Sequence, residues 1–250
     1  MTWHEDDSFW GDFYPAMYHK GRWEDAIDEA TQVAGLLGLS RGDRILDICC
    51  GPGRHALNFA RMGFQVVGID RTATYVEIGR RRATEEGLEV EFIQDDVRVF
   101  RGDGRYDASV SMYTSFGYFE NPDEDRRYLE SVCRALKPGG RLAIDLSGKE
   151  VLARVFRDRN WTELEDDTVF LEERGIEGDW ERIHNRWVLI REGTRIERRF
   201  SIRIYSGSEL KSLMLESGFE TVDLYGTLDG KPYDLAARRL VAVGRRGANG

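Results

Sequence analysis

Between residues 44 and 147, short apolar runs alternate with amphipathic segments, and this alternation restricts the possible folds more than any other feature. The pattern predicts strands at 44–50, 65–70, 90–96, 106–113 and 141–147. It predicts helices at 54–62, 72–87 and 122–136. Such alternation produces a parallel sheet with helices on both faces and the carboxyl ends of the strands along one edge. Ligands bind at that edge.

The segments on either side of this unit follow other patterns. A helix is expected over 22–38. After Lys149 the alternation stops, and three segments joined by short turns predict an antiparallel insertion, at 168–174, 180–190 and 194–205. A helix over 208–217 and two strands, 219–226 and 239–246, complete the chain. We therefore expect an α/β, Rossmann-like, doubly wound fold, with a seven-stranded, mostly parallel sheet, an antiparallel last strand and a small antiparallel β insertion.

Composition narrows the class of protein. The formal net charge of -9 argues against broad electrostatic binding to nucleic acid. No apolar run approaches the ~20 residues of a membrane helix, and the first residues lack the pattern of a secretory signal. The three cysteines do not form a disulfide framework, and the four histidines show no metal-ligand spacing. We expect a cytoplasmic protein without a metal, a membrane or a nucleic-acid partner, and leave its oligomeric state open.

A glycine turn follows the first predicted strand, in the run ILDICCGPGRH at residues 45–55. Gly51 and Gly53, with Ala56 and with Asp70 downstream, fit the fingerprint of a dinucleotide-binding loop. This interpretation, an NAD-dependent oxidoreductase, gives no role to Asp47, which lies four residues before the first glycine. It also gives none to the later acids or to the KPGG turn.

Taken together, the motifs resemble those of class I S-adenosylmethionine-dependent methyltransferases, in a bacterial branch of small-molecule type. The resemblance rests on LDICCGPGRH, VVGID, FIQDDV, LKPGGRLAID and the terminal strand pair, and runs from about Asp43 to Arg246. It implies a cofactor-binding core over 43–148 and 206–246. It also implies an N-terminal helical lid over 1–42 and an insertion over 149–205 that caps the acceptor site.

The resemblance also implies where the cofactor, S-adenosyl-L-methionine, and its product S-adenosyl-L-homocysteine would bind. Asp47 would face the ammonium group, and Asp70 would accept both ribose hydroxyls. Asp96 would accept from the adenine amino group beside the Val97 amide, with Asp95 as the competing candidate. The other predicted cofactor contacts are Cys49, Gly51, Gly53, His55, Arg71, Met112 and Tyr113.

The acceptor site is expected among the N-terminal segment, the insertion and the final loop. The aromatic N-terminus is interpreted as a lid, or as a segment that only packs on the domain. A period of two places Arg199, Arg203 and Tyr205 on one face of a strand, where they would bind an acceptor or pair with acids such as Glu181. The predicted substrate contacts are Tyr14, Tyr18, Tyr118, Arg199, Arg203, Tyr205 and Tyr233.

The function expected from these features is methyl transfer to an O or N atom of a small molecule by direct in-line displacement. The sulfonium is already activated, so the protein mainly aligns the reactants, and no catalytic residue is assigned. The alternatives are a non-catalytic protein that binds S-adenosylmethionine or S-adenosylhomocysteine, and the NAD-dependent oxidoreductase.

Overall fold

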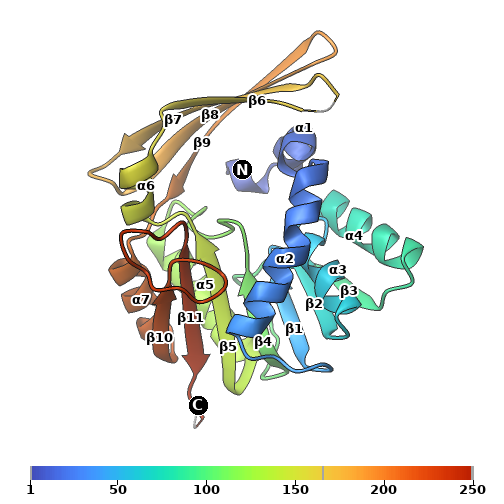
Figure 1. Cartoon of the computed structure of the whole chain (residues 1–250), viewed down its shortest axis with the longest axis vertical. Helices are drawn as coiled ribbons and strands as arrows, with labels where there is room; N and C mark the ends of the chain where they lie inside the picture. Colours follow the sequence, from blue (N-terminus) through green and yellow to red (C-terminus); the bar gives the residue numbers. More distant parts are fainter. Residues whose placement is uncertain (1, 165, 249–250) are drawn as a thin grey trace.

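The computed structural model describes residues 2–164 and 166–248, and its centre is a seven-stranded sheet (Figure 1). The strand order is β10-β11-β5-β4-β1-β2-β3. The strands are β1 (Arg44–Ile48), β2 (Gln65–Asp70), β3 (Val90–Gln94), β4 (Tyr106–Ser111), β5 (Leu136–Leu146), β10 (Phe219–Tyr225) and β11 (Leu240–Arg246). Strands β1 to β5 pair in parallel, and β11 runs antiparallel to both of its neighbours. The predicted sheet, with its antiparallel last strand, is confirmed.

Helices cover both faces of this sheet, which makes the fold doubly wound (Figure 1). One face packs on α2 (Lys20–Leu36), α3 (Arg54–Arg61) and α4 (Ala73–Glu85), and the other on α5 (Pro122–Ala135) and α7 (Gly207–Glu216). Neighbouring residues of β1 serve opposite faces, since Ile45 belongs to the first core and Leu46 to the second. Strands that are apolar on both sides are typical of a buried parallel sheet.

The insertion forms a separate antiparallel sheet with the order β6-β7-β8-β9, which we call the cap. Its strands are β6 (Arg159–Glu163), β7 (Val169–Glu177), β8 (Arg182–Arg191) and β9 (Thr194–Arg203), and α6 (Lys149–Val155) leads into it. Three of the four strands were predicted, whereas β6 and α6 were not. All five residues of β6 are exposed, so its sequence carries no alternating burial pattern.

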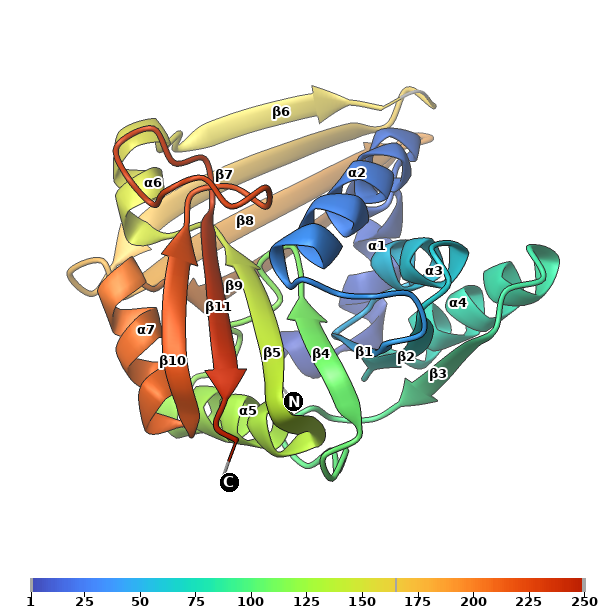
Figure 2. The same cartoon turned by 60° about the horizontal axis from the view of Figure 1, so that its bottom comes forward.

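The N-terminal segment fills the space between the cap and the core (Figures 1 and 2). It consists of η1 (Trp3–Glu5) and α1 (Asp7–Met17), and we call residues 2–18 the strap. Phe9 and Phe13 on α1 are buried against Phe170 and Leu189 of the cap. The strap therefore closes the edge of the main sheet at which the parallel strands end. No helix in 2–164 or 166–248 has the length and apolar character needed to cross a bilayer.

Candidate functional site

The glycine turn after β1 needs its glycines for geometric reasons. Gly51 and Gly53 have φ values of 56° and 88°, in the left-handed region that glycine tolerates. A Cβ on Gly51 would lie 2.4 Å from the hydroxyl oxygen of Tyr18, and one on Gly53 would lie 2.6 Å from Cζ of Phe92. The turn thus accepts close packing from the strap on one side and from β3 on the other.

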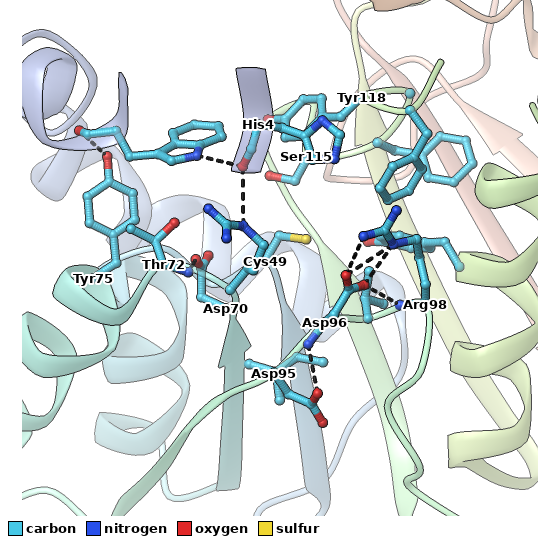
Figure 3. A pocket seen from close by; sticks show the side chains of 18 of the residues that line it. His4, Cys49, Asp70, Thr72, Tyr75, Asp95, Asp96, Arg98, Ser115 and Tyr118 are labelled. Carbon is cyan, nitrogen blue, oxygen red and sulfur yellow. Dashed lines mark hydrogen bonds and ion pairs between the residues drawn. The ribbon is translucent and has the colours of Figure 1, made fainter. Parts of the chain in front are cut away.

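A small cavity of about 90 Å³ lies where β2 and β3 end, and Figure 3 shows its lining. Asp70 accepts hydrogen bonds from the amides of Gly51 and Thr72, each at 2.8 Å. Burial raises the pKa of the Asp70 carboxyl despite these bonds. The predicted residues Cys49, Asp70, Arg71, Asp95, Asp96 and Val97 all line this cavity, as does Tyr118. We call it the nucleoside pocket.

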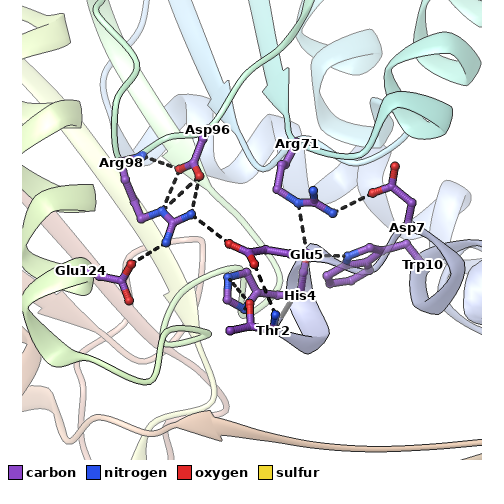
Figure 4. Close-up of polar contacts among 9 residues, drawn as sticks. All are labelled: Thr2, His4, Glu5, Asp7, Trp10, Arg71, Asp96, Arg98 and Glu124. Atoms are coloured by element: carbon purple, nitrogen blue, oxygen red, sulfur yellow. Dashed lines mark hydrogen bonds and ion pairs between the residues drawn. The ribbon is translucent and has the colours of Figure 1, made fainter.

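Arg98 is a residue of this pocket that the sequence analysis missed (Figures 3 and 4). Its Nε lies 3.0 Å from Oδ1 of Asp96, its backbone amide donates to the same oxygen, and its Nη2 donates to Oδ2. Burial alone would raise the pKa of Asp96, but the bonds from Arg98 outweigh it and lower that pKa. Within the described residues, Asp95 uses only Oδ1, which accepts from the Asp96 amide at 2.7 Å. The structure brings both acids to the pocket, and a choice between them as the adenine partner stays a prediction.

The strap covers the open side of the nucleoside pocket (Figure 4). Arg71 donates to Asp7 at 2.6 Å and to the carbonyl of His4 at 3.3 Å. Arg98 lies 3.4 Å from Glu5, and the hydroxyl of Tyr75 donates to the carbonyl of Trp10 at 2.7 Å. Arg71 is thus occupied by the strap.

A second cavity of about 620 Å³ lies between the core, the strap and the cap. It shares five lining residues with the nucleoside pocket: Trp10, Tyr18, Cys49, Ser115 and Tyr118. These shared residues mark a junction between the two cavities. The predicted residues Asp47, His55, Met112 and Tyr113 line the larger cavity, while Tyr14 packs on the rings of Tyr18 and Tyr75 and lines neither.

Asp47 is 1% exposed, and its Oδ2 has no hydrogen-bond partner among the described residues. Burial raises the pKa of its carboxyl to about 7. A buried, unpartnered carboxylate oxygen is costly unless a cation joins it. The side chain therefore suits a bound ammonium group.

Two guanidinium groups lie near this end of the cavity, and the sequence analysis missed both. Arg22 and Arg54 lie 4.3 Å and 4.9 Å from the ring centroid of Tyr113. Arg54 is buried and lies 3.8 Å from Glu29, whereas Arg22 forms no ion pair within 2–164 or 166–248. A ligand carboxylate could be held here, near the unpartnered carboxylate oxygen of Asp47. No short-range signal could have found Arg22, because it reaches the site from α2.

A buried network of ion pairs lies behind this end of the cavity. Glu29 lies 2.9 Å from Nε2 of His55 and 2.6 Å from Arg239, and Arg239 donates to Asp145 at 2.6 Å. Burial lowers the pKa of His55. The network joins α2, α3 and β5, and Asp145 also accepts from the Tyr113 amide at 3.2 Å. His55 thus lines the cavity while its Nε2 is engaged by Glu29.

Four predicted substrate residues line neither of these two cavities, although Arg203 and Tyr205 line a third of about 550 Å³, and their role as substrate contacts stays a prediction. Arg203 pairs with Glu181 and lies 3.6 Å from Asp125, to which the Tyr205 hydroxyl donates at 2.7 Å. Arg199 pairs with Glu197 at 3.0 Å. The Tyr233 hydroxyl donates to Glu150 at 2.8 Å.

The alternation along this stretch was predicted correctly, and Arg203 makes the ion pair with Glu181 that was the alternative to binding an acceptor. It is the apolar face, Phe200, Ile202 and Ile204, that lines the cavity. This face is apolar because the wall of the cavity is also the surface on which the cap packs against the strap. Within the described part of the chain, no group of acids, histidines and cysteines has the arrangement of a metal site.

Comparisons with known proteins agree with this geometry. Residues 45–140 match the model of a family described as a methyltransferase domain. The chain is 31% identical over 129 residues to the putative methyltransferase YqeM of Bacillus subtilis (strain 168), a match that covers 51% of this chain and 52% of the relative. It is 28% identical over 131 residues to dTDP-3-amino-3,4,6-trideoxy-alpha-D-glucopyranose N,N-dimethyltransferase of Streptomyces venezuelae, with 52% and 54% covered. The chain thus spans about half the length of these relatives.

The fold of nearly the whole chain is also found in a solved structure. An S-adenosylmethionine-dependent methyltransferase from Clostridium acetobutylicum ATCC 824 superposes with a TM-score of 0.76 at 16% identity, covering 96% of this chain and 98% of the other. The matched family model covers the glycine turn and the ends of β1, β2 and β3. Residues 45–140 thus match a methyltransferase-domain family, and the chain has the fold of a solved S-adenosylmethionine-dependent methyltransferase.

Proposed function

We propose that this protein transfers a methyl group from S-adenosylmethionine to an oxygen or nitrogen atom of a small molecule. One observation carries the proposal: the buried Asp47 carboxylate, with its unpartnered oxygen, lies at the wall of a cavity that Arg22 and Arg54 also line. The amino-acid part of S-adenosylmethionine is a zwitterion, and it needs a negative and a positive partner in the same cavity. A diphosphate would instead need a positive environment without Asp47.

The residues present fit the whole cofactor. Asp70 would hold the ribose, Val97 and either Asp95 or Asp96 the adenine, and Asp47 the ammonium group. When bound, S-adenosylmethionine would supply an activated methyl group and leave as S-adenosylhomocysteine, with one proton released from the acceptor. The chain excludes water and aligns the acceptor at the junction formed by Tyr18, Cys49, Ser115 and Tyr118.

A small acceptor is supported by the second cavity. Its volume of about 620 Å³ falls within the ~300–1,000 Å³ of small-molecule sites. The strap and the cap wall it on two sides, which does not suit a long polymer. The Streptomyces venezuelae relative is named for a dTDP-linked amino sugar, which is also a small molecule.

Calorimetric titration of the full chain with S-adenosylhomocysteine and with NADH tests the cofactor. We expect saturable binding of the first and none of the second; the reverse would favour an oxidoreductase and overturn the proposal. Turnover is tested by S-adenosylhomocysteine release with a panel of small hydroxyl and amine acceptors. Tight cofactor binding with no release for any acceptor class would favour the non-catalytic alternative.

A further inference from the structure

The inner face of the cap carries polar side chains where packing alone would place apolar ones. Cross-strand pairing sets Glu172 beside Asn160 and Trp187, and sets Asn185 beside Arg174. All five line the larger cavity. Apolar residues flank them on the same face, with Phe170 toward one end and Ile183 and Ile202 toward the other. We call Asn160, Glu172, Arg174 and Asn185 the polar strip.

The polar strip keeps hydrogen-bonding capacity that the protein does not use. Glu172 accepts from Arg174 and, at 3.1 Å, from the amide of Asn160. Asn185 is 5% exposed, and its amide donates only a long bond of 3.4 Å to the carbonyl of Ile183. In the described residues no donor reaches its Oδ1. Arg174 has five N–H donors, of which Glu172 engages one nitrogen.

The charge of the strip selects the class of ligand. Glu172 and Arg174 neutralise each other. An anionic ligand would be repelled by the carboxylate, and a cationic ligand would be repelled by the guanidinium. Hydroxyl groups both donate and accept, and they match a strip that offers acceptors at Glu172 and Asn185 and donors at Arg174. A ligand without such groups would leave these polar atoms unpaired, which is costly in a partly closed cavity.

Aromatic rings connect the polar strip to the junction of the two cavities. Phe200 pairs with Asn185 across β8 and β9. The ring of Trp3 lies 4.6 Å from that of Phe200 and 4.9 Å from that of Tyr118, which belongs to the junction. These rings provide an apolar surface for the non-polar face of a saturated ring.

We propose that the cap binds the methyl acceptor through the polar strip and that this acceptor is a neutral ring bearing several hydroxyl groups, as in the sugar class. This inference rests on the proposed function, because it assumes that the larger cavity is the acceptor site. Glu172, Arg174 and Asn185 would determine specificity and would not take part in methyl transfer.

Two neutral probes of similar size test the proposal with the full chain saturated with S-adenosylhomocysteine. Methyl α-D-glucopyranoside carries ring hydroxyls and methoxycyclohexane does not, and their dissociation constants are compared by ligand-observed NMR. We expect the glucoside to bind at least about tenfold more tightly, the equivalent of one good hydrogen bond. Equal binding, tighter binding of methoxycyclohexane, or no detectable binding of the glucoside would overturn the inference.

Matched variants locate the effect. Glu172→Gln keeps the shape of the side chain and should weaken glucoside binding about tenfold, with no change for methoxycyclohexane. Asn185→Leu should act in the same direction. Glu173→Gln is the control, because Glu173 follows on the same strand and pairs with Arg186 at 2.7 Å, outside the cavity. Unchanged preference in Glu172→Gln would contradict the role of the polar strip.

The affinity of each sample for S-adenosylhomocysteine separates the two levels of the argument. If S-adenosylhomocysteine binds but the hydroxylated probe is not preferred, this inference fails and the proposed function stands. If S-adenosylhomocysteine does not bind to the wild-type chain, both fail.

Discussion

At the scale of single residues, Asp47 combines a cost to folding with a benefit to binding. Its pKa is about 7 in the folded chain because of burial, against a usual 3.8. The folded state therefore holds the proton more tightly than the unfolded state, so stability falls as pH rises from about 4 to about 7 and then levels off. Asp47→Asn replaces the carboxyl with an amide that does not ionise, so the variant does not lose this stability as pH rises. We expect its free energy of unfolding at pH 9 to exceed that of the wild type by on the order of 4 kcal/mol, measured by urea denaturation.

The same substitution should weaken cofactor binding. Wild-type affinity for S-adenosylhomocysteine should rise as pH increases through about 7, because the ionised Asp47 carboxylate is the form that holds an ammonium group. The amide introduced by Asp47→Asn does not titrate, so the affinity of this variant should be lower and flat over this range. 5′-Methylthioadenosine lacks the amino-acid group and should bind both proteins alike. If Asp47→Asn also weakened the binding of 5′-methylthioadenosine, Asp47 would be needed to form the pocket and not to recognise the ammonium group.

Asp70 gives a second test at this scale. Asp70→Ala removes a carboxylate predicted to accept the ribose hydroxyls, and each charge-assisted bond lost should cost ~1.5–3 kcal/mol of binding free energy. Calorimetry with S-adenosylhomocysteine measures this loss. Glu77→Gln, on the exposed side of α4, is the control and should bind normally. An unchanged dissociation constant in Asp70→Ala would mean that the ribose is held elsewhere.

At the scale of elements, the strap is attached to the nucleoside pocket by a few polar contacts. Arg71→Ala removes the contacts with Asp7 and the His4 carbonyl. Because exposed ion pairs contribute ~0–1 kcal/mol, we expect amide exchange of residues 2–17 to accelerate up to about fivefold, with faster release of S-adenosylhomocysteine. Hydrogen exchange with mass spectrometry measures the first and stopped-flow displacement the second. Arg81→Ala, which loses only an exposed pair with Glu85 on α4, should change neither.

The elements also show what a sequence pattern can and cannot predict. Strands and helices of the core follow from periodicity, because each has a side that must be buried. The five exposed residues of β6 have no such side, so only its pairing with β7 makes it a strand. Acids at strand ends could be located by position, since topology brings these ends together. The contacts of Arg98 with Asp96 and of Arg22 with Tyr113 depend on side-chain conformation and on distant elements, and no pattern encodes them.

At the scale of the whole molecule, the packing is divided into unequal units. The two large clusters flank the main sheet, whereas Phe9, Phe13, Phe170 and Leu189 form a separate cluster between strap and cap. Trp3, Trp10 and Trp187 pack on this separate cluster. It supports the wall that the strap contributes to the cavities, so the integrity of the site depends on a unit outside the cores of the main domain.

This division predicts a loss of cooperativity when the separate cluster is weakened. Phe13 is fully buried, and Phe13→Ala should cost ~3–5 kcal/mol, mostly within the strap and cap. Five of the six tryptophans, all but Trp23 of α2, lie in the strap and the cap, so tryptophan fluorescence should then change mainly at a lower temperature than far-ultraviolet ellipticity. Phe59, equally buried in a main core, provides the comparison: Phe59→Ala should shift both signals together. Coincident transitions in Phe13→Ala would mean instead that strap, cap and core unfold as one unit, and that neither cavity can open while the main sheet stays folded.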